Sequence, residues 1–189
     1  QPVGINWRIA SRFLLEGRLD THHETFYEGI EQIPPGSGFE VGLDGAWHQW
    51  AFWSLDTLPQ TVTTDPAATF ADLFEDSVRI RMRSDVPVGV CLSGGLDSTA
   101  IICAAARHRD ESAGTQPESL QAFCYMAKEF DESQYITDTL LQTHAQLRQL
   151  ETSPADLWND VRKVLWFQDE PVHTMTAVVG YQLMRLAAS

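Results

Sequence analysis

The stretch VPVGVCLSGGLDSTAIICAAARH, residues 86 to 108, decides the fold because it joins a strand to a helix through a turn of small residues. Its apolar beginning predicts a short strand over residues 86 to 92, and its strong helix formers predict a helix over residues 98 to 108. The turn between them holds two glycines, two serines and an aspartate. A strand, a tight turn and a helix in this order are typical of α/β folds.

The turn carries the polar groups expected of a phosphate-binding site. Backbone N–H groups from Gly94 to Asp97 would lie at the carboxyl edge of the sheet, where the helix dipole also favours an anion. The hydroxyls of Ser93 and Ser98 would add to these amides, and Asp97 fits a Mg²⁺ ion between itself and the phosphates. The usual P-loop is absent because the turn is shorter and no lysine follows it. The sequence therefore predicts metal-assisted binding of a nucleotide polyphosphate.

Strands and helices alternate from about residue 63 onward. A second apolar strand is predicted over residues 120 to 126, LQAFCYM. Three helix starts are predicted from capping residues, at Asp65–Pro66, at Asp131 with Gln134, and at Ser153–Pro154, and a last apolar helix occupies residues 172 to 189. The fold class is therefore α/β, with a mainly parallel sheet and flanking helices.

The first 62 residues differ from the rest of the chain. An apolar-alternating stretch, an Asp44–Gly45 turn and an aromatic stretch predict a β-hairpin there. We therefore divide the chain into a β-rich segment, residues 1–62, and an α/β segment, residues 63–189.

Composition narrows the possible partners and the compartment. The net charge of -13 disfavours nucleic acid as a partner, because binding to its backbone draws on clustered Lys and Arg. The sequence has neither a run of about 20 apolar residues nor a signal peptide, which predicts a cytoplasmic protein without a membrane partner. Its three cysteines, at positions 91, 103 and 124, lie in apolar stretches without C-x-x-C spacing, and we expect buried, reduced thiols.

The turn LSGGLDST resembles the S-G-G-x-D-S pyrophosphate loop of the N-type ATP pyrophosphatases, and its surroundings resemble glutamine-hydrolysing asparagine synthetase. The upstream FYEGIEQIPPG resembles that family's junction between its glutaminase and synthetase domains. Further matches to that family are RSDVPVGVCLSGGLDS, AFCYM followed by DES, and DEP at residues 169 to 171. The resemblance extends over about residues 24 to 185, and the loop with its leading strand is its most specific part. It implies that residues 1–62 are the tail of an N-terminal nucleophile glutaminase domain with a linker.

The resemblance implies adenylation of the aspartate side-chain carboxylate by ATP with release of pyrophosphate, followed by attack of ammonia derived from glutamine to give asparagine and AMP. The residues implied to bind ATP are Leu92, Ser93, Gly94, Gly95, Leu96, Asp97, Ser98 and Tyr125. Asp97 would hold Mg²⁺. Asp169 and Glu170 would lie beside the reacting centre, and a homodimer is compatible with this reading.

Several alternatives stay open on the sequence. Residues 172 to 180, VHTMTAVVG, differ from the sequence usual in the family at this place, which leaves the identity of the acceptor carboxylate open. β-Lactam synthetases and lasso-peptide cyclases share the architecture and adenylate a carboxylate, but they close a ring. GMP and NAD synthetases are related types that the junction disfavours, and a relative that binds nucleotide without chemistry is the other alternative.

Some of these residues also have a structural interpretation. The glycines could simply permit a tight turn with Asp97 or Ser98 as a helix cap, and residues 169 to 171 could simply end a helix. Capping adequately explains Asp131 and Glu132, and the three arginines at positions 79, 81 and 83 favour a solvated helix face over phosphate contacts. DTHHE, residues 20 to 24, has metal-ligand residue types without a partner cluster.

The family's glutamine hydrolysis depends on an N-terminal cysteine, whereas this sequence begins with Gln1. We therefore expect the 189 residues to be an internal fragment of a longer ligase, inactive in asparagine synthesis by themselves.

Overall fold

The computed structural model describes residues 3–58, 62–111, 120–126 and 132–189 of the chain. It divides into two compact units, Gln1–Val62 and Thr63–Ser189. None of the described helices is both long enough and apolar enough to cross a bilayer.

The first unit contains a helix and a hairpin. Helix α1 (Trp7–Glu16) is capped by Asn6, whose side chain accepts a hydrogen bond from the N–H of Ile9. Strands β1 (Ser37–Val41) and β2 (Trp47–Ala51) pair antiparallel, and the short helix η1 (Leu55–Thr57) follows. The predicted hairpin is confirmed: Gly45 has a φ of 83°, and the Asp44 carboxylate accepts from the N–H of Ala46 at 3.1 Å.

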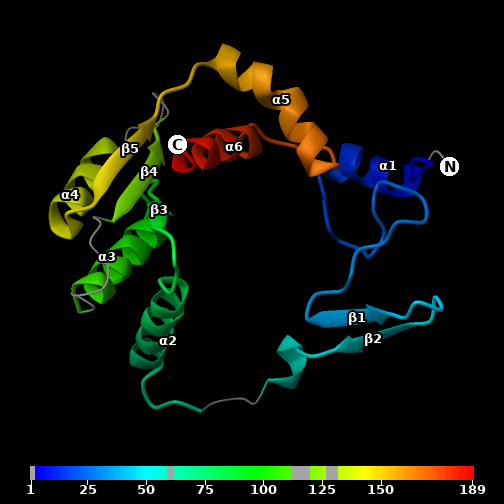
Figure 1. Ribbon diagram of the computed structural model, residues 1–189, viewed down its shortest axis with the longest axis horizontal. Coiled ribbons are helices and arrows are strands. Elements are labelled where there is room, and N and C mark those ends of the chain that lie inside the picture. Colours follow the sequence, from blue (N-terminus) through cyan, green and yellow to red (C-terminus); the bar gives the residue numbers. More distant parts are fainter. Residues whose placement is uncertain (1–2, 59–61, 112–119, 127–131) are drawn as a thin grey trace. The chain divides into compact units, whose positions relative to one another are not determined.

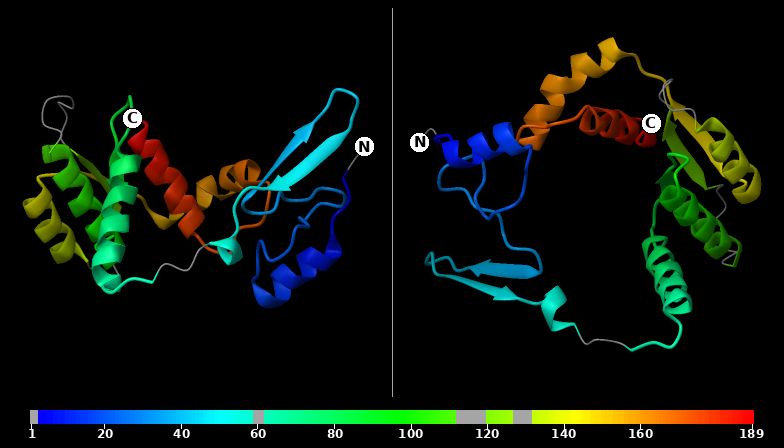
Figure 2. Two further views of the ribbon diagram at one scale, coloured as in Figure 1. Left: turned by 90° about the horizontal axis from the view of Figure 1, so that it is seen from below. Right: turned by 180° about the vertical axis from the view of Figure 1, so that it is seen from behind.

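The second unit is a parallel sheet with helices on both faces. Its strands β3 (Gly89–Cys91), β4 (Gln121–Tyr125) and β5 (Gln146–Leu150) pair in the order β3-β4-β5. Its helices are α2 (Pro66–Arg81), α3 (Leu96–Glu111), α4 (Ser133–Thr143), α5 (Pro154–Gln168) and α6 (Thr176–Ala187). Figures 1 and 2 show α3 and α4 on one face of the sheet and α6 on the other. The predicted parallel α/β architecture of this segment is confirmed.

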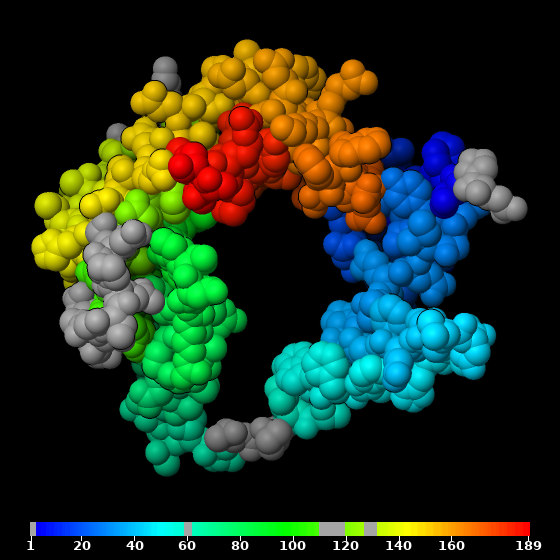
Figure 3. All heavy atoms as spheres, in the orientation of Figure 1, coloured from blue at the N-terminus to red at the C-terminus, as the bar shows by residue number. Residues whose placement is uncertain are grey.

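Two clusters of buried side chains hold this unit together. The larger one lies where α2, α3 and α4 meet the sheet, and its buried members are Val78, Leu92, Ile102, Ala104, Ala105, Ala106, Leu120, Ala122, Cys124 and Ile136. The smaller one joins α5 to α6 through Leu157, Val164 and Val178. In the space-filling view, α6 in red lies against the yellow residues around β5 and the orange residues of α5 (Figure 3).

The structure corrects several expectations. Strand β5 was not predicted from the sequence; its residues QLRQL are almost all exposed because the strand lies at an edge of the sheet. Cys91 is exposed rather than buried, since β3 forms the opposite edge, whereas Cys124 on the central strand is buried and desolvation raises the pKa of its thiol. Asp131 lies outside the described residues, and the residue that precedes α4 is Glu132.

Two of the predicted helix starts are confirmed by their caps. The Asp65 carboxylate accepts from the N–H of Ala68 at 3.0 Å, ahead of Pro66. Ser153 and Asp156 form a capping box at the start of α5, with the Ser153 N–H donating to the Asp156 carboxylate at 3.1 Å. The Ser153 hydroxyl and N–H hold the pKa of the Asp156 carboxyl below its ordinary value.

We predict that Ile102→Ala lowers the free energy of unfolding by about 2 to 5 kcal/mol, because Ile102 is 0% exposed and its removal leaves a cavity between α3 and its neighbours. Ile101→Ala is the matched control: Ile101 is 39% exposed, and we expect a loss below about 1 kcal/mol. Urea denaturation measures both. Equal losses would contradict the assignment of Ile102 to the core.

We also predict that Asp156→Ala destabilises the chain at neutral pH and that the effect shrinks in acid. A lowered pKa means that the folded state binds the proton less tightly than the unfolded state. The stabilisation is therefore complete above the ordinary carboxyl pKa of about 3.9 and disappears as the pH falls through the lowered one. Urea denaturation at several pH values measures the free energy of unfolding, and Asp138→Ala serves as a control at an exposed acid. A loss of stability in Asp156→Ala that does not change with pH would contradict the prediction.

Candidate functional site

The predicted loop begins at the carboxyl edge of the sheet. The N–H of Leu92, a residue only 1% exposed, donates to the carbonyl of Phe123 at 2.8 Å and so extends the pairing of β3 with β4. Ser93 is exposed and starts the loop, and α3 begins only three residues later at Leu96. The core thus fixes the loop's origin, and the helix starts two residues before the predicted position.

Two serine hydroxyls hold the loop in shape. The Ser98 hydroxyl accepts from the N–H of Ser93 at 3.2 Å and donates to the Gly95 carbonyl at 3.1 Å. The Ser93 hydroxyl accepts from the N–H of Gly95 at 3.3 Å and lies 3.1 Å from the Ser98 hydroxyl. The two hydroxyls expected at a phosphate are therefore also the groups that close the loop.

The first turn of α3 presents backbone donors. The carbonyl of Gly95 accepts the first bond of the helix, from the N–H of Thr99 at 3.1 Å, so Gly95 occupies the cap position. Glycine has no side chain to cap the helix, and the N–H groups of Leu96, Asp97 and Ser98 have no acceptor within the helix. This arrangement suits an anion. It also removes the interpretation of Asp97 or Ser98 as the N-terminal cap residue.

Gly94 is the sterically restricted position of the loop. Its φ is +86°, in the region that favours glycine, and a Cβ built on it would lie 2.7 Å from the Cβ of Glu132 and 3.2 Å from the Glu132 carbonyl oxygen. Gly95 has more room, because its Cβ would meet only the Ser93 hydroxyl, at 3.4 Å. The two glycines therefore serve different purposes.

Asp97 and Leu96 are both exposed on the first turn of α3. Asp97 makes no hydrogen bond or ion pair to another described residue, which leaves its carboxylate available to a cation. Tyr125 is half-buried and ends β4, next to the strand that carries the loop. Leu92, Tyr125 and the loop thus share one edge of the sheet, as predicted.

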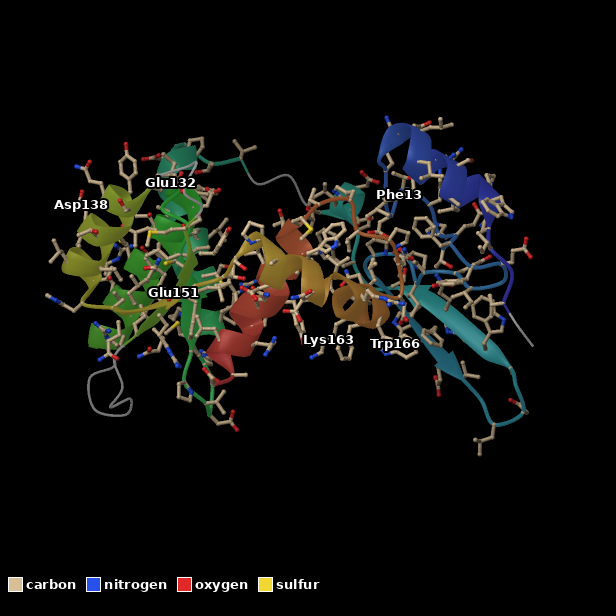
Figure 4. The ribbon with its side chains drawn as sticks, turned by 90° about the horizontal axis from the view of Figure 1, so that it is seen from above. Phe13, Glu132, Asp138, Glu151, Lys163 and Trp166 are labelled. Carbon is tan, nitrogen blue, oxygen red and sulfur yellow. The ribbon has the colours of Figure 1, made fainter. Side chains whose placement is uncertain are left out.

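The structure does not bring Asp169 and Glu170 into this group. Asp169 ends α5 with a φ of 57°, and its N–H donates to the Leu165 carbonyl at 3.2 Å, which matches the interpretation of this segment as a helix stop. Figure 4 shows Trp166, on the last turn of α5, well apart from Glu132 beside the loop. A role of the two acids beside the reacting centre stays a prediction.

The other candidates are explained by local contacts. The side chains of Arg79 and Arg81 bond to Asp76 and Ser77 on their own helix, as a solvated helix face predicts. Around residues 20 to 24, Asp20 accepts from Gln32 at 2.6 Å, and His22 contacts Arg12. Among the described residues, no group of three His, Cys, Asp or Glu side chains is placed to hold a metal.

No feature of the sequence predicts the hollow of about 470 Å³ that lies beyond the end of β5, between α5 and α6. At its wall Gln182 donates to the Asp160 carboxylate at 2.8 Å, and Arg185 lies 3.5 Å from the same carboxylate. The Gln182 amide oxygen and the Thr152 hydroxyl are buried there without a partner among the described residues, which buried water would supply. No motif in the sequence pointed to this pairing of two helices.

Comparison with known proteins places the loop inside a recognised domain. A family model described as asparagine synthase matches residues 69–189. The glutamine-hydrolyzing asparagine synthetase 1 of Bacillus subtilis is 28% identical over 166 residues, which cover 86% of this chain and 24% of that protein. The glutamine-hydrolyzing asparagine synthetase of Brassica oleracea is 34% identical over 127 residues, 64% of this chain and 21% of that protein. The chain therefore spans about a quarter or less of the length of these relatives.

We predict that Gly94→Ala lowers the free energy of unfolding by about 1 to 3 kcal/mol, because it forces an L side chain into a left-handed backbone and against Glu132. Gly95→Ala is the matched control, one residue along the same loop, and should cost less than about 1 kcal/mol. Urea denaturation of the two variants decides the point. A Gly94→Ala variant as stable as wild type would show that the loop does not need this conformation.

Proposed function

Because the chain belongs to the asparagine synthase family, we propose that it supplies the ATP-binding part of a glutamine-dependent, amide-forming ligase. The observation that carries the proposal is the loop itself: a helix start capped only by glycine, two hydroxyls beside it and a free carboxylate on its first turn. The surrounding sequence resembles that of enzymes named for asparagine synthesis from glutamine, and the proposed substrates are accordingly aspartate, ATP and ammonia from glutamine.

In the proposed reaction, a side-chain carboxylate oxygen of aspartate forms a bond to the α-phosphorus of ATP, and the bond to the bridging oxygen breaks with release of pyrophosphate. Ammonia then attacks the acyl carbon, loses a proton and displaces AMP to give asparagine. The contribution of this chain is to bind and orient the leaving pyrophosphate. Preorganised N–H donors stabilise the charge that develops on it.

Each residue of the loop would contact a different part of the nucleotide. The N–H groups of Leu96 to Ser98 face the place where a phosphate can approach the helix start, and the left-handed backbone of Gly94 turns the chain so that the helix begins there. The Ser93 and Ser98 hydroxyls can exchange their mutual contact for a phosphate oxygen. Leu92 and Tyr125, at neighbouring strand ends, would flank the nucleoside.

The residues present also fit a magnesium ion, because Mg²⁺ needs only one or two protein carboxylates besides phosphate oxygens and water. Asp97 would hold it. When bound, the ion would neutralise charge on the leaving pyrophosphate. We further propose that the first unit is the tail of the glutaminase domain; its helix and hairpin are compatible with this and do not identify it.

We predict that Asp97→Asn, in the full-length enzyme, reduces aspartate-dependent exchange of labelled pyrophosphate into ATP by about 100-fold or more, the size of loss typical when one electrostatic stabiliser is removed. Asp72→Asn, an equal charge change at an exposed position on α2, should leave exchange unchanged. Unfolding of both variants by urea should match wild type, since both side chains are exposed.

Aspartate-dependent exchange of pyrophosphate into ATP distinguishes the proposed function from its alternatives. A nucleotide-binding relative without chemistry binds ATP and shows no exchange with any carboxylic acid. A ring-closing relative exchanges with a different acid. Normal exchange in Asp97→Asn would rule out the metal role of Asp97.

A further inference from the structure

Glu132 occupies the position before α4 without capping it. Its backbone angles are φ -97° and ψ 13°, and its side chain makes no capping hydrogen bond. Glutamate is not among the residues preferred at this position, where shorter side chains reach the free N–H groups. The carboxylate makes no hydrogen bond or ion pair within the described part of the chain. An explanation of Glu132 as a cap residue, which the sequence suggested, is therefore wrong.

The side chain lies against the loop instead. From the place where a Cβ on Gly94 would be, the Glu132 carboxylate Oε2 and carbonyl oxygen are each 3.2 Å away. This contact joins the loop after β3 to the loop after β4. Only a glycine at position 94 lets the two approach so closely, and a carboxylate therefore lies at the rim of the candidate site.

The chemistry of this carboxylate limits what it can bind. An ionised carboxylate only accepts hydrogen bonds, and it repels phosphate oxygens. The phosphate-binding N–H groups belong to Leu96, Asp97 and Ser98, on the α3 side of Gly94. Glu132 lies beside Gly94, and in the chain it follows Tyr125, the last residue of β4. The carboxylate thus belongs to the segment after the strand of the expected nucleoside end and lies beside the loop of the expected phosphate end.

A nucleotide has its ribose between these two ends, and the ribose carries two hydroxyl donors. We propose that the Glu132 carboxylate accepts hydrogen bonds from the ribose hydroxyls of the bound nucleotide and so selects ATP over deoxy-ATP. The inference rests on the proposed function, because it takes ATP as the ligand of the loop. Hydrogen bonds to a charged acceptor are strong enough to change affinity about 10-fold or more.

The test measures dissociation constants of ATP, 2′-deoxy-ATP and 3′-deoxy-ATP with Mg²⁺ on the full-length protein by titration calorimetry. Wild type should bind ATP about 10-fold more tightly than at least one deoxy form. Glu132→Ala should lose that preference and bind ATP as weakly as the deoxy form. Glu132→Gln keeps the length of the side chain and an acceptor oxygen but not the charge. We therefore expect its preference for ATP over the deoxy form to lie between those of wild type and Glu132→Ala.

Asp138→Ala is the matched control, because Asp138 is an exposed acid of the same helix. Figure 4 shows it on the outer side of α4, apart from Glu132. It should keep the wild-type preference. The magnesium dependence of binding and the KM for aspartate should stay unchanged in Glu132→Gln, since a change in either would assign the carboxylate to the metal or to the substrate's ammonium group.

The outcomes separate this inference from the proposed function. Selective ATP binding without aspartate-dependent exchange would support the ribose contact and contradict the ligase chemistry. Exchange with equal affinity for ATP and both deoxy forms, or a Glu132→Ala variant that still selects ATP, would overturn the ribose contact alone. A wild-type protein that binds no ATP would overturn both.

Discussion

The left-handed backbone of Gly94 is the constraint on which the candidate site depends. The chain leaves a buried strand end at Leu92 and must start a helix at Leu96, and a φ of +86° at Gly94 makes this reversal possible within three residues. A longer turn would let α3 begin away from the sheet. Because the turn is this short, the free N–H groups of α3 lie at the carboxyl edge of the sheet beside the end of β4.

Close packing behind the loop keeps this geometry in place. Helix α3 places three consecutive alanines, Ala104, Ala105 and Ala106, at most 7% exposed, against the larger core cluster. Small side chains let a helix approach its neighbours closely, and Ile102 fills the remaining space at 0% exposure. The helix axis, and with it the direction of its first N–H groups, is therefore fixed by the core rather than by the loop.

The sequence predicted the parts of this site that are local. The loop, the preceding strand and the strand at residues 121 to 125 were found because each combines a short apolar run with adjacent turn residues. It missed β5, because an exposed edge strand has too few apolar residues to show a pattern. It misjudged Glu132, because the contact with Gly94 joins residues far apart in the chain, and no local spacing indicates which loop a side chain will meet. Residues 169 and 170 match a family motif, but their local structure shows only that Asp169 ends α5, so their role near the reacting centre stays a prediction.

The charge of the chain explains why the loop has to be built in advance. Because the chain has a net charge of -13 and exposed acids at Asp97 and Glu132, a polyphosphate gains no attraction from the overall field. Binding then depends on short-range donors that are already ordered. The bonds from Ser93 and Ser98 close the loop before any ligand arrives, so little conformational entropy remains to be lost on binding. The Asp97 carboxylate would repel a nucleotide that arrives without its metal, so the metal role proposed for Asp97 also favours the magnesium complex of ATP over the free nucleotide.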